Sequence, residues 1–209
     1  ILKSYVKLFN SGSASNTGCT TVAGYTAGAA LASGEGENTF FGCEAGKSIT
    51  TGTKNTIIGA KAAESLVDDN NNTVIGGDAF KNSTGSANVA VGTSTLAASG
   101  SKTNCIAIGV SALGLCTTGG NNVAIGRSAL YSNLTGADCT AVGAYALTAN
   151  TATGNTAFGS DALRANTSGN YNTALGQNAL KKNTTGTQNT AAGHGAGTVV
   201  TTGSDNAIY

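Results

Sequence analysis

The sequence predicts an all-β protein, a parallel β-solenoid of about 11 coils built on a 17-residue repeat. The first observation is a recurring phrase, Asn-Thr-Ala-large apolar-Gly, whose final glycines are separated by 17 or 16 residues. The second is that the columns flanking these glycines hold the same residue types in nearly every copy. A fixed period of this kind indicates stacked structural repeats rather than an ordinary globular domain. The repeat glycines are Gly42, Gly59, Gly76, Gly92, Gly109, Gly126, Gly143, Gly159, Gly176 and Gly193.

The two ends of the repeat set the domain boundaries. Gly24, preceded by Thr-Val-Ala, indicates an eleventh copy that is one residue out of step, and Asn206 begins a twelfth. We therefore assign residues 1–18 to an N-terminal cap or connector. Residues 19–209 form the solenoid domain, whose C-terminus lies within a further repeat.

Each repeat favours strand over helix. Only about nine residues are patterned between turn signals, and they are rich in Thr, Val and Gly. A β-branched residue and a bulky residue two apart share one strand face, with Ala between them on the other. We expect two short strands and a turn per coil, with the bulky face inward. The small Ala column, or the Leu column after the glycine, is expected to meet a neighbouring chain.

A column of Asn stands four residues before the glycine. Aligned side-chain amides can hydrogen-bond along a stack of coils, so this column predicts an Asn ladder. Glycine at the corner suits a bend with positive φ or a close backbone approach. Cys105 and Cys139 replace Asn in two copies. The predicted ladder consists of Asn38, Asn55, Asn72, Asn88, Asn122, Asn155, Asn172 and Asn189.

The composition excludes several classes of function. Charged residues make up 10% of the chain, against roughly 25% in typical soluble domains. The net charge of +1 gives no field for binding nucleic acid. No run of 18 apolar residues is present, so no membrane insertion by a helix is expected. Neutral, Asn- and Thr-rich surfaces are common in extracellular fibrous proteins, which predicts an extracellular or virion-surface location.

The sequence contains no recognisable motif for catalysis, for a cofactor or for a metal ion. The stretch Gly-Cys-Glu-Ala-Gly-Lys-Ser at 42–48 has three residues where a phosphate loop needs four before its Gly-Lys pair. His194, the only histidine, falls where other copies carry polar turn residues, so we expect it to face solvent. The acidic residues that share a column lie in non-adjacent coils, which supports neither glycoside hydrolysis nor calcium binding. We expect no catalytic, cofactor or metal site.

Cysteines and glycosylation sequons have more than one interpretation. Five cysteines cannot pair fully within one chain. We expect mostly small buried thiols, with one irregular bridge near the N-terminus as an alternative. The sequons either carry glycans or reflect the preference of Asn for tight turns. They begin at Asn71, Asn82, Asn133, Asn166 and Asn183.

The repeats resemble a known family. The stretches at 121–130, 87–96 and 104–113 (Asn-Asn-Val-Ala-Ile-Gly in the first) are similar to the head repeats of YadA-like trimeric adhesins. The Asn-Thr-Ala-Leu-Gly version is similar to repeats of phage and large-virus tail fibres. The resemblance covers roughly residues 20–209. It implies a left-handed parallel β-roll with three chains side by side. The period of 17 or 16 is longer than in the adhesin repeats.

The expected function is structural: a viral or phage tail-fibre or spike segment, homotrimeric, that attaches to a host surface. A bacterial adhesin head is the near alternative, and an ice-binding solenoid is an alternative of another class. A Thr column broken by Val89, Ile106 and Val123, on a face expected to point inward, argues against ice binding. A host glycan or protein would meet variable turn residues. The candidates are Tyr131, Asn133, Tyr145, Arg164, Tyr171, Lys181 and Lys182.

Overall fold

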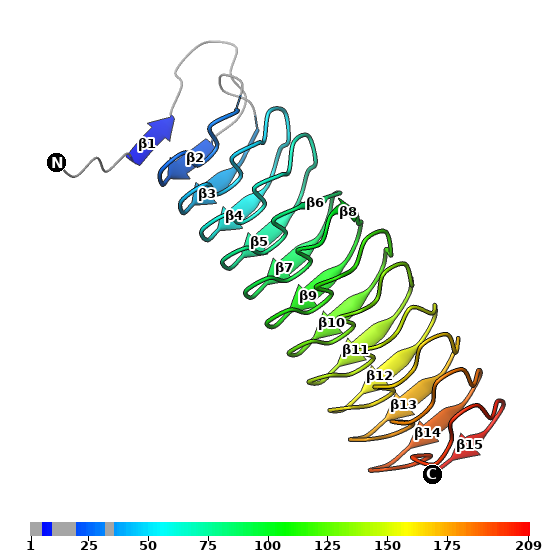
Figure 1. Ribbon diagram of the computed structural model, residues 1–209. Coiled ribbons are helices and arrows are strands. Elements are labelled where there is room, and N and C mark those ends of the chain that lie inside the picture. The colour runs from blue at the N-terminus through cyan, green and yellow to red at the C-terminus, as the bar shows by residue number, and fades with distance from the viewer. Residues whose placement is uncertain (1–5, 10–19, 32–35) are drawn as a thin grey trace.

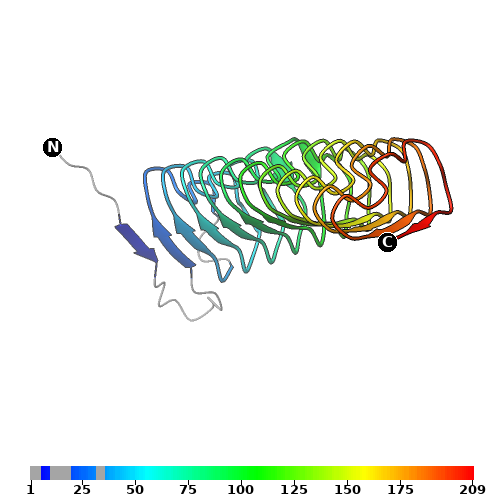
Figure 2. The same cartoon turned by 90° about the horizontal axis from the view of Figure 1, so that it is seen from below.

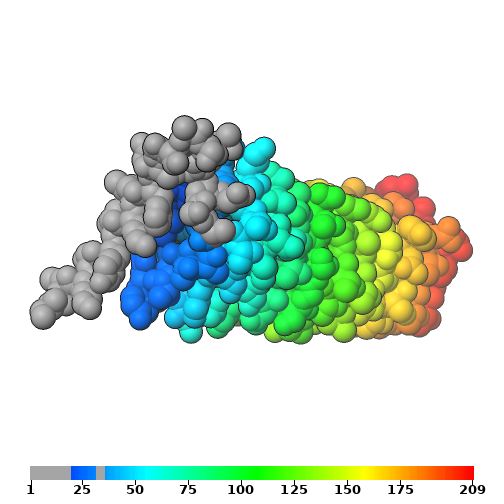
Figure 3. Space-filling model, turned by 90° about the horizontal axis from the view of Figure 1, so that it is seen from above, coloured from blue at the N-terminus to red at the C-terminus, as the bar shows by residue number. Residues whose placement is uncertain are grey.

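The computed structural model describes residues 6–9, 20–31 and 36–209, which form an all-β rod of stacked coils (Figure 1). Thirteen strands make one sheet that runs from one end of the rod to the other. In space-filling view the coils appear as successive bands along the rod (Figure 3). The strands are β1 (Val6–Phe9), β2 (Thr20–Ala23), β3 (Thr39–Phe41), β4 (Thr56–Ile58), β5 (Thr73–Ile75), β7 (Val89–Val91), β9 (Ile106–Ile108), β10 (Val123–Ile125), β11 (Thr140–Val142), β12 (Thr156–Phe158), β13 (Thr173–Leu175), β14 (Thr190–Ala192) and β15 (Ala207–Ile208).

The register of the sheet follows the sequence repeat. From β2 onward each strand pairs in parallel with the next at equivalent positions, as Thr56 does with Thr73. The coils that are one residue shorter keep this register, because Thr140 still pairs with Thr156 and the missing residue falls in a turn. β1 pairs antiparallel with β2 and so covers the N-terminal edge of the sheet.

The structure corrects the expectation of two strands per coil. Most coils contribute a single strand, and the only second sheet among the described residues pairs β6 (Ser83–Thr84) with β8 (Gly100–Ser101). These two lie on the side of the rod opposite the long sheet (Figure 2). The turn after the corner glycine contains residues with positive φ, such as Ser128 at +54° and Leu130 at +51°. Left-handed residues interrupt extended backbone, so a second strand cannot form there.

The expected orientation of the strand faces was also wrong. The central strand residue, usually Ala, points into the coil and is buried, as Ala107 and Ala124 are at 0% exposure. The β-branched and bulky residues on either side point outward, and Ile108 is 38% exposed. The Leu column is likewise interior, as Leu113 and Leu130 show. Neither the Ala nor the Leu column is therefore available to a neighbouring chain.

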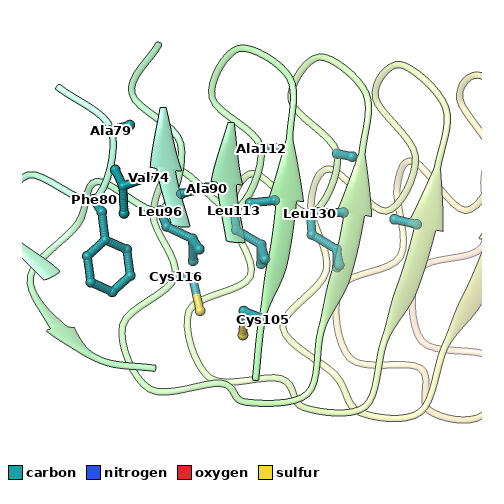
Figure 4. Packing of buried hydrophobic residues seen from close by; sticks show 14 of the residues in the cluster. Val74, Ala79, Phe80, Ala90, Leu96, Cys105, Ala112, Leu113, Cys116 and Leu130 are labelled. Atoms are coloured by element: carbon teal, nitrogen blue, oxygen red, sulfur yellow. The ribbon is translucent and has the colours of Figure 1, made fainter. Parts of the chain in front are cut away.

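Packing across the coil explains this orientation. The Ala column faces the Leu column from the opposite wall, and both are completely buried (Figure 4). Near the N-terminus the large and the small residue exchange places. Phe40 occupies the strand position that is usually Ala, and Gly46 occupies the opposite position that is usually Leu. A side chain on Gly46 would come within 2.9 Å of the Phe40 ring. The coil interior is narrow, so in most coils a large residue on one wall faces a small residue on the other.

The corner glycines are required for two reasons. Their φ angles lie between +122° and +138°, a region that side-chain-bearing residues rarely adopt. In addition, each corner stacks directly on the next. A Cβ atom on Gly109 would lie 2.7 Å from the carbonyl carbon of Gly126. The 17-residue spacing of glycine thus follows from the close approach of successive coils.

Candidate functional site

The Asn column forms a ladder in the interior. The Oδ1 atom of Asn55 accepts hydrogen bonds from the backbone N–H of Asn72 at 3.0 Å and from its Nδ2 at 3.2 Å. Asn55 Nδ2 in turn donates to the carbonyl of Asp69 at 2.9 Å. Every ladder Asn is at most 1% exposed. Buried amides with these bonds satisfied hold the coils in register and leave little for a ligand.

A second Asn column was missed in the sequence. Asn133, Asn150, Asn166 and Asn183 are completely buried, and Asn166 Oδ1 accepts a 2.9 Å hydrogen bond from Asn183 Nδ2. Their regular position seven residues after the corner glycine could have revealed them. Glycosylation at Asn133, Asn166 and Asn183, and contact of Asn133 with a receptor, are therefore wrong, because these amides lie inside. Asn71 and Asn82 are exposed.

Cysteines interrupt the ladder in two coils. Cys105 and Cys139 occupy the Asn column, and both are buried with Cys116. Cys105 and Cys116 each donate a thiol hydrogen bond to the carbonyl of Gly119, at 3.4 and 3.5 Å, and lie as neighbours in Figure 4. Burial raises the pKa of all three thiols, that of Cys116 to about 11. Cys43 is exposed and unpaired, and Cys19 lies outside the described residues.

A buried lysine lies beside these thiols. Lys102 is 1% exposed, and its Nζ donates to Ser83 Oγ at 2.9 Å, to the Ala98 carbonyl at 2.5 Å and to the Gly100 carbonyl at 3.3 Å. Desolvation lowers the pKa of Lys102 to about 8. The sequence analysis did not identify Lys102. Its position, three residues before Cys105, is occupied by glycine in several other coils, and this exception to the pattern could have revealed it. Through these hydrogen bonds Lys102 connects neighbouring turns inside the solenoid.

The outward face of the long sheet is the most extensive candidate interaction surface. We call it the outer sheet face and define it as the first and third residues of the strands from β3 to β14. Its apolar members include Phe41, Phe158 and Leu175, which are 61%, 46% and 42% exposed. Midway along the rod both columns are apolar, through Val89, Val91, Ile106, Ile108, Val123 and Ile125. Of these six, Ile106, Ile108 and Ile125 are exposed and the three valines are half-buried. A continuous apolar surface that water can reach is typical of a binding interface.

The turns after the corner glycines bring some of the predicted contact residues together. Tyr145 lies between two arginines: the guanidinium carbons of Arg127 and Arg164 are 5.5 and 5.2 Å from its ring centroid. Asp161 pairs with Arg164 at 3.0 Å and with Lys181 at 3.4 Å. Arg127 was not among the predicted contacts. Its place in the column directly after the corner glycine gave no indication of the tyrosine in the next coil.

The other predicted contacts do not join this group. Tyr131 lies against Gly114, where a Cβ atom would come within 2.8 Å of its ring, and Tyr171 covers Gly154 in the same way at 2.6 Å. Tyr171 is 64% exposed, and Lys182 is also exposed. These side chains are dispersed over different turns.

The described ranges show no further arrangement for chemistry. No group of three or more His, Cys, Asp or Glu that could hold a metal ion occurs within them. His194 is exposed, as expected from the sequence. None of the described residues belongs to a helix that is long and apolar enough to span a membrane.

Comparisons with known proteins give no relative. No family model, no curated protein and no solved structure matches the chain. The functional interpretation therefore rests on the geometry of the solenoid and its surfaces.

Proposed function

We propose that this chain is a structural segment of a homotrimeric fibre or spike, viral or phage in type, that attaches to a host surface. The observation that carries the proposal is the outer sheet face. Apolar residues in register along the length of a rod would stay in contact with water in a single chain. Burying a side chain such as Ile or Phe contributes about 1.5–3 kcal/mol.

Three copies arranged around a common axis would bury this face along its whole length. Side by side, the three sheets would turn their Ala columns away from the axis and their Ile, Val and Phe columns toward it. The turns would stay on the outside, where a receptor can reach them. Three equivalent sets of weak contacts would then act together through avidity.

The test is the native mass with and without a charge on the outer sheet face. Light scattering of the unaltered chain is expected to give three times the chain mass of 20.3 kDa. Ile108→Lys is expected to give a monomer, because an ammonium group would have to be buried in the interface. Leu134→Lys is the matched control, since Leu134 is similarly exposed (44%) but lies in a turn. A monomeric unaltered chain, or a trimer of Ile108→Lys, contradicts the proposal.

Host attachment is tested separately from assembly. Fluorescently labelled trimer is expected to bind host cells at least tenfold better than labelled Ile108→Lys monomer, because avidity requires linked copies. Equal binding by both species would contradict attachment by an assembled fibre.

Ice binding is supported by one observation of its own. The Thr column was expected to lie inside but faces outward. Thr39 and Thr190 are exposed, and Thr73 in the same column is half-buried. Outward-facing Thr residues can order water, so this alternative gains from the structure, although Val89, Ile106 and Val123 interrupt the column midway along the rod. The measurement is thermal hysteresis, which is the difference between the melting and freezing temperatures of ice in a solution of the protein. A hysteresis that disappears in Thr73→Lys would favour ice binding, and its absence in the unaltered chain would exclude it.

A further inference from the structure

We propose that Arg127, Tyr145 and Arg164 form a binding site for the carboxylates of an acidic, uronate-type sugar chain. The proposal rests on the proposed host attachment and names the ligand class. The three residues come from three successive coils: one, two and five positions after Gly126, Gly143 and Gly159. Only the stacking of the coils brings them together.

The tyrosine holds the two arginines in place. Both guanidinium carbons lie within cation–π range of the Tyr145 ring, at 5.5 and 5.2 Å. The ring itself is fixed by its backbone, whose N–H donates to the Arg127 carbonyl at 2.9 Å and whose carbonyl accepts a 2.7 Å bond from Thr148 Oγ1. Planar guanidinium groups held against a ring lose less entropy on binding. Arg164 donates one N–H bond to Asp161 through Nη1 and has further N–H donors for a ligand.

The charge around this site is unbalanced. Arg164 and Lys181 share the carboxylate of Asp161, and no carboxylate among the described residues pairs with Arg127. The equivalent turns nearer the N-terminus are neutralised: Lys47 lies 3.6 Å from Glu44 and 3.9 Å from Glu64, and Lys81 lies 3.0 Å from Asp78. Residues 126–193 contain four Lys and Arg residues and two Asp, whereas residues 42–85 contain four Lys and five Asp and Glu, so the excess positive charge lies in the coils around Tyr145.

The geometry favours a chain of carboxylates. Arginine binds carboxylate through two parallel N–H bonds, which a point charge such as lysine cannot provide. Cations on successive coils are spaced along the rod axis at multiples of about 4.8 Å. A polyuronate lying along the rod would place carboxylates near Arg127, Arg164 and Lys181 in turn, whereas a neutral polysaccharide would offer these cations no carboxylate.

The experiment measures binding of the full chain to immobilised polygalacturonate, with neutral dextran and dextran sulfate as comparison surfaces, at physiological salt. Arg127→Gln and Arg164→Gln are each expected to weaken binding roughly 10-fold or more, the size of a lost charged hydrogen bond. Lys47→Gln is the matched control because Lys47 occupies the same turn position as Arg164. It removes the same charge and is expected to change binding less than about twofold.

Three outcomes would overturn the site. No binding to polygalacturonate, an equal loss in Lys47→Gln, or tighter binding to dextran sulfate than to polygalacturonate would each show that no carboxylate-selective site exists. Circular dichroism of each variant checks that the solenoid is intact. Light scattering on the same samples separates the two proposals: a trimer that ignores polygalacturonate overturns the ligand alone. A monomer that binds it overturns the fibre alone.

Discussion

Asn55 and Asn72 are joined twice, because Oδ1 of Asn55 accepts both the backbone N–H and the side-chain Nδ2 of Asn72, at 3.0 and 3.2 Å. The same pair of bonds links Asn72 to Asn88 and Asn172 to Asn189. A single side chain thus satisfies the backbone of the next coil and fixes its register. The ladder is therefore an energetic feature of the solenoid as well as a sequence pattern.

Asn55→Ala is expected to lower the free energy of unfolding by at least about 1–3 kcal/mol, because the buried backbone N–H of Asn72 loses its acceptor. Asn82→Ala, at an exposed turn position, serves as control with a change below about 0.5 kcal/mol. Urea unfolding followed by circular dichroism measures both. Similar midpoints for the two variants would contradict the ladder's role.

Cys139→Asn is expected to stabilise the chain by about 1 kcal/mol. The Oδ1 of Asn122 already accepts the Cys139 backbone N–H at 2.9 Å, and the Ala152 carbonyl stands 3.2 Å from the thiol, ready to accept an amide N–H. Asn172 makes this same set of bonds in its own coil. The exposed Cys43→Asn is the comparison, and a thermal midpoint of Cys139→Asn at or below that of the unaltered chain would be inconsistent with ladder repair.

Gly109→Ala is expected to cost at least about 1–3 kcal/mol from backbone strain alone, since φ is +122°. The added Cβ atom would also lie 2.7 Å from Gly126, so the coils must separate at that level. Gly77→Ala provides the control, because its Cβ would meet nothing closer than 4.0 Å. We expect limited proteolysis to cut near residue 109 only in the first variant, and equal protection of both would argue against corner stacking.

Lys102 predicts a pH dependence with a definite sign. Its pKa is about 8 in the folded chain and 10.5 when unfolded, a difference equivalent to about 3 kcal/mol. Between these values the unfolded chain binds the extra proton, so the destabilisation is complete below pH 8 and disappears as the pH rises toward 10.5.

The measurement compares thermal midpoints of the unaltered chain and Lys102→Met from pH 7 to 10.5. The buried thiols, whose pKa values are raised, act in the opposite direction by losing stability above pH 9. They remain in both proteins, but the charge of Lys102 lowers the pKa of Cys105 and Cys116, so its removal adds a thiol contribution of the same sign above pH 9. The difference between the two curves from pH 8 to 9 therefore reports mainly Lys102. That difference is expected to shift in favour of the unaltered chain as the pH rises, and a constant difference would show that Lys102 is not desolvated.

The sequence alone determined the solenoid, its period, its corner glycines and its Asn column. These follow from a physical requirement that acts at every coil: each copy must pair with the next, so its backbone-bonding and close-contact positions cannot vary. The spacing of Gly109 from Gly126 and of Asn55 from Asn72 records that requirement directly.

Only the tertiary structure decided which strand face is interior. The alternation of side chains along a strand places Ala107 and Ile108 on opposite faces. It does not say which face is buried, because either face has a regular column of apolar residues. Leu113 on the opposite wall settles the matter, because Leu113 and Ala107 are both buried in the narrow interior of the coil. The same holds for Lys102 and for the Arg127, Tyr145 and Arg164 site. Their contacts form across coils between unlike columns, and such contacts depend on the path of each turn rather than on the repeat.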